Sequence, residues 1–262
     1  PDDFDMPDGG VSIRWPDPWR EQDHRLQRYK GFAALAFARA NKIDRIVWDS
    51  PNPRFGIISS GKSYQDVRQA LFELGIDEER AREIGLRLYK VGMPWPLEPE
   101  GARHFCEGLE EILVVEEKRE LIEHQLKWQL FNWREEVRPS VFGKHDENDQ
   151  WLLPPENELT VGQIAHVIAE RLARHYESET IRKKIDNFKA REIRLADFTA
   201  PIDRTPYFCS GCPHNTSTKV PEGSRATAGI GCHIMAMNMD RSTETYTQMG
   251  GEGVPWIGQA CF

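Results

Sequence analysis

The chain has 262 residues, enough for one large domain or two modest ones with a buried core. Hydrophobic residues make up 39% and charged residues 29%, and no run approaches the ~18 consecutive apolar residues of a spanning helix, which excludes an integral membrane protein. The formal charge of −8 argues against nucleic acid as the main partner, because phosphate binding requires a basic face.

The five cysteines are too few and too unevenly spaced for the disulfide scaffold of a small secreted protein. Residues 1–10 resemble neither a signal peptide nor a transit leader, so we expect a cytoplasmic protein. The chain opens in a Pro/Asp/Gly-rich segment and closes on the apolar residues 256–262, whereas natural termini are more often polar. We therefore expect an internal part of a longer polypeptide.

The first half of the chain alternates between two hydrophobic periods. Apolar side chains at helical spacing predict a helix within residues 20–41. A short apolar strand is expected over 55–59, followed by a helix over 64–74 that Gly75 ends. The elements expected next are a helix from Asp77 to Gly85, a partly alternating segment over 86–93, a helix over 100–109, a strand over 112–115 and a helix over 120–131. Short strands alternating with helices predict an α/β fold with a small parallel sheet.

The second half changes character twice. Residues 134–158 are charged and lack a clear period, which indicates a connector. Thr160 then caps an amphipathic helix that extends to Tyr176, and 181–194 is another polar stretch. From Pro201 onward the chain is rich in Gly, Cys, Thr and Met, so we expect the chemistry of the protein there.

Residues 56–63 match the phosphate-loop pattern G-x-x-x-x-G-K-S. In a true phosphate loop the strand comes first and the loop amides are free to bind phosphates. Here the predicted strand lies inside the motif and leaves only Ser60, Gly61 and Lys62 as a turn. This context argues against nucleotide hydrolysis, although the start of the following helix could still bind an anion weakly.

Cys209-x2-Cys212, followed by Cys232, is the strongest chemical signal in the sequence. In an intracellular protein this spacing is typical of metal or cluster ligation, because one turn can direct two thiolates at the same centre. A structural zinc site completed by His214 or His233 is an alternative, although these spacings are unusual for zinc. A redox dithiol is the third interpretation, but it requires a βαβ context that is not apparent here.

Two glycine-rich segments lie near these cysteines. Residues 248–253 contain Gly250, Gly251 and Gly253, and such a turn allows a backbone to approach a diphosphate, although an ordinary loop has the same pattern. Residues 229–233 place small side chains around Cys232, which suits a bulky inorganic group. Cys106, by contrast, falls on an apolar helix face and is expected to be a buried, unreactive side chain.

Taken together, residues 208–215, 229–232 and 249–253 closely resemble the 2-oxoacid:ferredoxin oxidoreductases, specifically the long fused indolepyruvate ferredoxin oxidoreductases of bacteria. The resemblance extends upstream. Residues 6–17 and 33–41 look like the exit from the first thiamine-fold domain of that family, and residues 56–63 and 114–119 look like its transketolase-C-terminal-like domain.

The resemblance implies a domain organisation. Residues 1–50 would be the exit from a preceding thiamine-fold domain with a linker helix, and 51–133 a transketolase-C-terminal-like α/β domain. Residues 134–200 would form a connector with an amphipathic helix, and 201–262 the truncated N-terminal part of a thiamine diphosphate and iron–sulfur domain.

The family's chemistry follows as a further implication. Its members use thiamine diphosphate and Mg²⁺ to decarboxylate a 2-oxo acid, pass electrons through a four-iron four-sulfur cluster to ferredoxin and form an acyl-CoA. Cys209, Cys212 and Cys232 match three of the four cluster ligands. The fourth ligand and the motif that binds Mg²⁺ and the diphosphate would lie beyond Phe262, so Cys261 is not assigned this role.

The resemblance also implies which other residues and partners matter. His214, Gly250, Gly251 and Gly253 would lie on the cofactor side of the site, and Lys62 could contact coenzyme A phosphates. The expected partners are ferredoxin, a 2-oxo acid, coenzyme A, the remaining domains of the parent polypeptide and a further copy of the protein.

Two functions from different classes therefore remain. The first is a segment, inactive alone, of an oxidoreductase that converts a 2-oxo acid, an aryl pyruvate such as indolepyruvate, to an acyl-CoA. The second is a structural zinc-binding module without redox activity. An iron–sulfur cluster absorbs visible light and zinc does not, so colour separates the two.

Overall fold

A computed structural model describes residues 4–12, 15, 17–196 and 204–262. The chain divides into two compact units, residues 1–195 and 196–262, and each is described separately below. Within the described residues, no helix has both the length and the apolar character needed to cross a bilayer.

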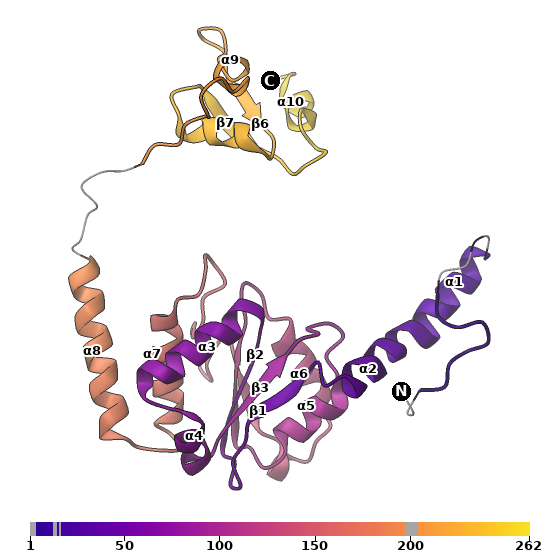
Figure 1. Ribbon diagram of the computed structural model, residues 1–262, viewed down its shortest axis with the longest axis vertical. Helices are drawn as coiled ribbons and strands as arrows, with labels where there is room; N and C mark the ends of the chain where they lie inside the picture. The colour runs from indigo at the N-terminus through magenta and orange to yellow at the C-terminus, as the bar shows by residue number, and fades with distance from the viewer. Residues whose placement is uncertain (1–3, 13–14, 16, 197–203) are drawn as a thin grey trace. The chain divides into compact units, whose positions relative to one another are not determined.

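The first unit is built on a five-stranded sheet in the order β1-β3-β2-β4-β5 (Figure 1). Its strands are β1 (Arg45–Trp48), β2 (Phe55–Ser60), β3 (Leu86–Val91), β4 (Glu111–Val115) and β5 (Ser140–Phe142). Strands β3, β2, β4 and β5 are mutually parallel, whereas β1 runs antiparallel to β3 at one edge. The expected α/β class with a small, mostly parallel sheet is therefore confirmed.

Helices cover both faces of this sheet, with α3 and α7 on one side and α5 and α6 on the other (Figure 1). Alternate residues of the strands point to the two faces, as the pleat requires. In β4, Leu113 and Val115 join the core beneath α3 and α7, and Ile112 and Val114 join the core beneath α5 and α6. All four side chains are at most 1% exposed, which explains why residues 112–115 of β4 are continuously apolar rather than alternating.

Three helix boundaries follow from capping residues that are visible in the sequence. Helix α3 (Gly61–Leu74) ends at Gly75, whose left-handed φ of 75° is typical of a helix C-terminus. Helix α4 (Glu78–Ile84) begins at Asp77, whose carboxylate accepts the Arg80 amide hydrogen. Helix α7 (Val161–Leu172) begins with a reciprocal capping box between Thr160 and Gln163. These three predictions are confirmed.

Two helices are shorter than the ranges expected for them. Helix α5 is Pro99–Cys106 rather than 100–109, because Glu98 caps its start and Gly108, with a φ of 79°, lies in the turn that follows it. Helix α6 is Ile122–Leu130, close to the expected 120–131, and it is followed by a 3₁₀ turn at Glu135–Val137.

At the amino-terminal end of the first unit the expected helix is confirmed, and at the carboxyl-terminal end the structure adds a helix that the sequence analysis did not predict. The helix expected within 20–41 is α1 (Trp19–Arg25), a π-helical turn (Leu26–Lys30) and α2 (Gly31–Ala40). The polar stretch at 181–194 is part of an 18-residue helix, α8 (Glu179–Ala196). Ile181, Ile185 and Phe188 of α8 pack on the core of the first unit, and this packing explains how a largely polar sequence forms a helix here.

A buried ionic network joins α7 to the amino-terminal end of β4. Arg171 is fully buried, and its guanidinium donates to Glu111 at 2.6 Å and to Glu147 at 2.7 Å. The same guanidinium lies 4.0 Å from the centre of the Phe142 ring. Arg174 forms a second ion pair with Glu147 at 2.6 Å. These contacts fix the connector, residues 134–158, to the sheet.

The second unit is built from short elements. In chain order they are α9 (His214–Ser217), β6 (Ala226–Ala228), a 3₁₀ helix (Cys232–Asn238), β7 (Thr243–Tyr246) and α10 (Val254–Gln259). Strands β6 and β7 pair in parallel as a two-stranded sheet. Loops therefore carry most of the candidate site residues.

Candidate functional site

The G-x-x-x-x-G-K-S motif does not form a phosphate loop. The strand lies inside the motif, as predicted, but the expected turn of Ser60, Gly61 and Lys62 is absent: β2 occupies residues 55–60 and α3 begins directly at Gly61. No free loop amides therefore remain to surround a phosphate. The Lys62 ammonium lies 2.7 Å from Asp66, 3.8 Å from Glu117 and 3.6 Å from Glu158. Three carboxylates around this cation disfavour a phosphate at the same position, including those of coenzyme A.

Cys209 and Cys212 lie at the two ends of one tight turn in the second unit. The Cys212 amide donates to the Cys209 carbonyl at 3.0 Å, and the Asn215 side-chain amide donates to the same carbonyl at 3.0 Å. Gly211, between them, has a φ of 76°, a conformation that glycine adopts without strain. Cys209 is exposed and Cys212 is half-buried. The turn thus keeps both thiols accessible to a shared ligand.

His214 follows this turn as the first residue of α9 and contacts Cys212 directly. Its Nδ1 lies 3.2 Å from the Cys212 Sγ. The His214 ring stacks on Phe208, with ring centres 5.3 Å apart, and on His233, with ring centres 5.9 Å apart. His233 is adjacent in sequence to Cys232, so these rings join the two cysteine-bearing segments of the unit.

The two glycine-rich segments also lie against each other. Gly229 packs so closely on Glu252 that a Cβ at position 229 would overlap the Glu252 side chain. The Glu252 carboxylate in turn accepts the Gly250 amide hydrogen at 2.7 Å. Gly251 is buried, whereas Gly250 and Gly253 are exposed with φ values of 86° and 81°. The glycine turn therefore adjoins the Cys232 segment, and its role in binding a cofactor stays a prediction.

A cavity of about 300 Å³ opens beside these segments in the second unit. His214 and His233 form part of its wall, and the remaining lining is mainly hydroxyl and small apolar side chains: Ser217, Thr218, Val220, Ala226, Thr227, Ala228, Ala236 and Thr243.

The three candidate cluster ligands suit iron by their chemistry, because cysteine thiolates hold iron–sulfur clusters. Cys209 and Cys232 are exposed and Cys212 is half-buried. Over residues 4–12, 15, 17–196 and 204–262, however, the structure gathers no group of three or more Cys, His, Asp or Glu side chains that could hold a metal ion. Cys209 and Cys212 share a turn, but Cys232 does not join them at one point. Iron ligation by the three thiols therefore stays a prediction.

A buried polar cluster in the first unit was not found from the sequence. At the carboxyl end of β4, the Glu116 carboxylate accepts the amide hydrogens of Leu121, Ile122 and Glu123 at the start of α6. The Lys144 ammonium donates to the Glu116 carbonyl at 2.6 Å. Burial raises the pKa of Glu116 and lowers that of Lys144, because it disfavours both charged forms. The contacts give this cluster a structural role in fixing α6 to the sheet.

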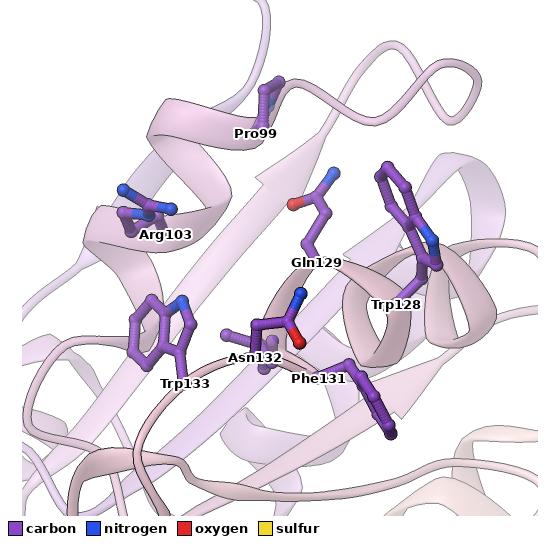
Figure 2. A pocket seen from close by; sticks show the side chains of 8 residues that line it. Pro99, Arg103, Trp128, Gln129, Phe131, Asn132 and Trp133 are labelled. Carbon is purple, nitrogen blue, oxygen red and sulfur yellow. The ribbon is translucent and has the colours of Figure 1, made fainter.

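The first unit also has an aromatic hollow of about 310 Å³ between α5 and the end of α6 (Figure 2). Figure 2 shows Arg103 and Trp133 on one side of it and Trp128 on the other. The hollow contains none of the predicted site residues. Cys106, in α5, is fully buried, and burial raises the pKa of its thiol to about 12, which confirms the prediction of an unreactive side chain.

Several known proteins are similar to this chain. Residues 44–196 match the model of the indolepyruvate ferredoxin oxidoreductase middle domain. The indolepyruvate oxidoreductase subunit IorA of Pyrococcus horikoshii is 29% identical over 205 residues, which cover 76% of this chain and 28% of that subunit. The IorA subunit of Methanothermobacter marburgensis is 24% identical over 237 residues, covering 86% of this chain and 33% of the subunit. The chain thus spans about a third or less of these curated relatives.

Two solved structures give weaker likenesses. The 2-oxoglutarate:ferredoxin oxidoreductase of Magnetococcus marinus has a TM-score of 0.39 and 16% identity, covering 64% of this chain and 26% of that chain. A split-gene transketolase has a TM-score of 0.35 and 12% identity, covering 51% of this chain and 42% of that chain. TM-scores this low do not establish a shared fold, whereas the family match covers more than half of the chain. The chain therefore belongs to the indolepyruvate ferredoxin oxidoreductase middle domain family.

Proposed function

We propose that the chain is part of an oxidoreductase that oxidatively decarboxylates a 2-oxo acid, an aryl pyruvate such as indolepyruvate, to an acyl-CoA and delivers the electrons to ferredoxin. The family match over residues 44–196 carries this proposal. The curated relatives that resemble the chain are named as indolepyruvate oxidoreductase subunits. The protein would act in the cytoplasm as a homo-oligomer.

Within this function, the two units have different tasks. Residues 51–133 would form the transketolase-C-terminal-like domain, residues 134–200 the connector, and residues 201–262 the start of the cofactor domain, preceded by the linker helix of residues 1–50. Cys209, Cys212 and Cys232 would hold a four-iron four-sulfur cluster, with a fourth ligand from outside these 262 residues. Cys209 and Cys232 are exposed and Cys212 is half-buried, so their thiols are open to iron.

Thiamine diphosphate with Mg²⁺ supplies an electron sink for the loss of CO₂, and the cluster carries electrons one at a time. This chain's own residues would line one side of the site. The close contact between Gly229 and Glu252, together with the bond from Glu252 to the Gly250 amide, fixes the glycine turn next to Cys232. Gly250, Gly251 and Gly253 would line the cofactor there, since without side chains they let the backbone approach it closely.

Metal analysis of the complete polypeptide, purified anaerobically, tests the proposal. Replacing Cys212 with Ala should remove about four irons and four sulfides relative to the unaltered protein. Cys261→Ala is the matched control, because Cys261 is also an exposed thiol in the second unit and should retain the full content. One zinc per chain without sulfide would contradict the proposal and favour the structural zinc module instead.

A further inference from the structure

An exposed aromatic surface lies on the α5 and α6 side of the first unit. Within residues 45–172, most of the exposed large apolar side chains lie in the loop between β3 and α5 or in residues 121–137, which contain α6. They are Trp95, Leu121, Trp128, Phe131 and Val137, against Phe72 and Trp151 elsewhere in that range. Trp128 is 79% exposed and Phe131 is 74% exposed. Clustered apolar surface of this kind marks an interaction site, whereas single exposed apolar residues do not.

The loop between β3 and α5 is fixed on α6, so the surface is one feature. The Gln125 side chain accepts the Leu97 amide hydrogen at 2.7 Å and donates to the Pro94 carbonyl at 2.8 Å. These two bonds hold the loop residue Trp95 beside the helix that carries Trp128. The aromatic hollow between α5 and the end of α6 is part of the same surface (Figure 2).

A basic side chain lines this hollow. The Arg103 guanidinium lies over the Trp133 ring, 5.9 Å from its centre, and Figure 2 shows Trp128 across the hollow from both. Over the part of the chain that the structure describes, no hydrogen bond or ion pair engages this guanidinium. Tryptophan and arginine are the residue types that most often dominate binding at protein interfaces. The hollow therefore fits an apolar side chain accompanied by a carboxylate.

The path of the chain indicates what covers this surface. Helix α2 is joined to the same side of the sheet, because the Arg39 guanidinium lies 2.7 Å from the Glu98 carboxylate at the start of α5. Just after α2, the Asp44 carboxylate accepts the amide hydrogens of Gly92 and Met93. Helix α8, by contrast, packs on the core beneath α3 and α7. The polypeptide that enters through α2 thus approaches the aromatic surface, whereas the chain that leaves through α8 starts from the opposite face (Figure 1).

The family assignment points to the occupant. The family is a middle domain, and the match covers only 28% of the Pyrococcus horikoshii subunit, so most of such a subunit lies outside it. We propose that the part of the complete polypeptide that precedes residue 1 docks on the aromatic surface, with an apolar side chain in the hollow and a carboxylate on Arg103. This interface rests on the domain order of the proposed function and goes beyond it, because it names the contact surface.

Cysteine labelling of the complete polypeptide tests whether the surface is covered. Trp128→Cys places a thiol in the surface, and Phe72→Cys is the matched control, because Phe72 is 73% exposed on α3. A maleimide pulse read by peptide mass spectrometry measures each site apart from the native cysteines. Trp128→Cys should react about tenfold more slowly in the folded protein than in urea, because an interface excludes solvent, and Phe72→Cys should react similarly in both. Equal rates for Trp128→Cys would overturn the proposal.

A photo-crosslinker identifies the occupant. With p-benzoyl-phenylalanine in place of Trp128, illumination of the complete polypeptide should join this position to peptides that precede residue 1 in the same chain. A covalent dimer would show that a second copy covers the surface and would overturn the proposal. Crosslinks confined to peptides that follow residue 262 would overturn it as well.

Charge reversal at Arg103 tests the carboxylate. Arg103→Glu would set like charges against each other and should raise the labelling rate of Trp128→Cys about tenfold, with the rate of Phe72→Cys unchanged. An unchanged rate for Trp128→Cys would overturn the pairing with Arg103. None of these measurements depends on iron or a cofactor, so a polypeptide that assembles no cluster would contradict the proposed function and leave this interface intact.

Discussion

The two units of this chain differ in what stabilises each of them internally. In the first unit, two hydrophobic cores enclose the sheet, and most strand residues facing them are almost fully buried. In the described part of the second unit, residues 204–262, the buried hydrophobic side chains are Phe208, Ala228 and Ala236. The predicted ligands and cofactor residues all lie in this second, weakly packed unit.

This difference places the residues that stabilise the fold in the first unit and the predicted ligand and cofactor residues in the second. The first unit has enough apolar burial for a stable domain, whereas one phenylalanine and two alanines cannot offset the conformational entropy of about sixty residues. Small domains with little core commonly depend on a metal site or on contacts with a partner. We infer that a cluster held by this unit, as proposed above, would contribute much of its order.

The largest effect is expected in the buried ionic network of the first unit. Arg171→Ala would leave the Glu111 and Glu147 carboxylates without the Arg171 cation, and Glu111 is buried. The substitution should therefore lower the free energy of unfolding by about 3–5 kcal/mol. Urea titration measures this loss. Arg174→Ala is the control, since this half-exposed arginine contacts the same Glu147 and should cost clearly less. The iron content of both variants should remain unchanged. A fall in iron would contradict the view that the first unit provides stability while the second carries the metal site.

A smaller effect is expected where the backbone of the first unit has no room. A Cβ at Gly143 would overlap the Glu123 carboxylate. This carboxylate is held in place because it accepts hydrogen bonds from the Lys144 amide and the Lys127 ammonium. Gly143→Ala should therefore cost about 1–3 kcal/mol.

Gly31 provides the matched comparison for this substitution. It lies in α2 with open space around the Cβ position, so Gly31→Ala should stabilise the helix by about 0.5–1 kcal/mol. Equal thermal unfolding midpoints for the two alanine variants would contradict the packing seen around Gly143.

The smallest effect is a dependence of stability on pH. Hydrogen bonds from Arg174 and Arg171 lower the pKa of Glu147 from its ordinary value of 4.5 to about 2. Because this pKa is depressed in the folded state, the stabilisation is complete above pH 4.5 and is lost as the pH falls toward about 2. Urea midpoints between neutral pH and about pH 2 should therefore fall more steeply in the unaltered protein than in Glu147→Gln. Parallel profiles would show that the pairing is weak.

The sequence predicted those parts of the fold whose causes are local. Asp77, Gly75 and Thr160 mark helix ends through their own side chain or backbone, and β2 and β4 are buried on both faces, so each contains a continuous apolar run, 55–58 in β2 and 112–115 in β4. Elements stabilised by distant partners were missed. Strand β5 is three residues long and owes its place to pairing with β4, and α8 depends on packing against the first core. Arg171 and Glu111 are 60 positions apart in the chain.

The site was predictable in its residue types but not in its arrangement. Cysteine spacing identified Cys209 and Cys212, and the structure places them on one turn. Nothing in the spacing indicated that His214 would lie between the rings of Phe208 and His233. Nor did it indicate that Arg241, 33 positions from Phe208 in the chain, would lie over the Phe208 ring. His233 was considered only as a zinc ligand, whereas its Nε2 accepts a backbone hydrogen bond from Gly229.

The central claim is that residues 204–262 bind an iron–sulfur cluster and depend on it for their order. Hydrogen exchange of the complete polypeptide, measured anaerobically before and after removal of iron with a chelator, tests this claim most directly. We expect the amides of residues 204–262 to lose protection while those of β2, β3 and β4 keep theirs. Unchanged protection of residues 204–262 after the iron has been removed would contradict the account.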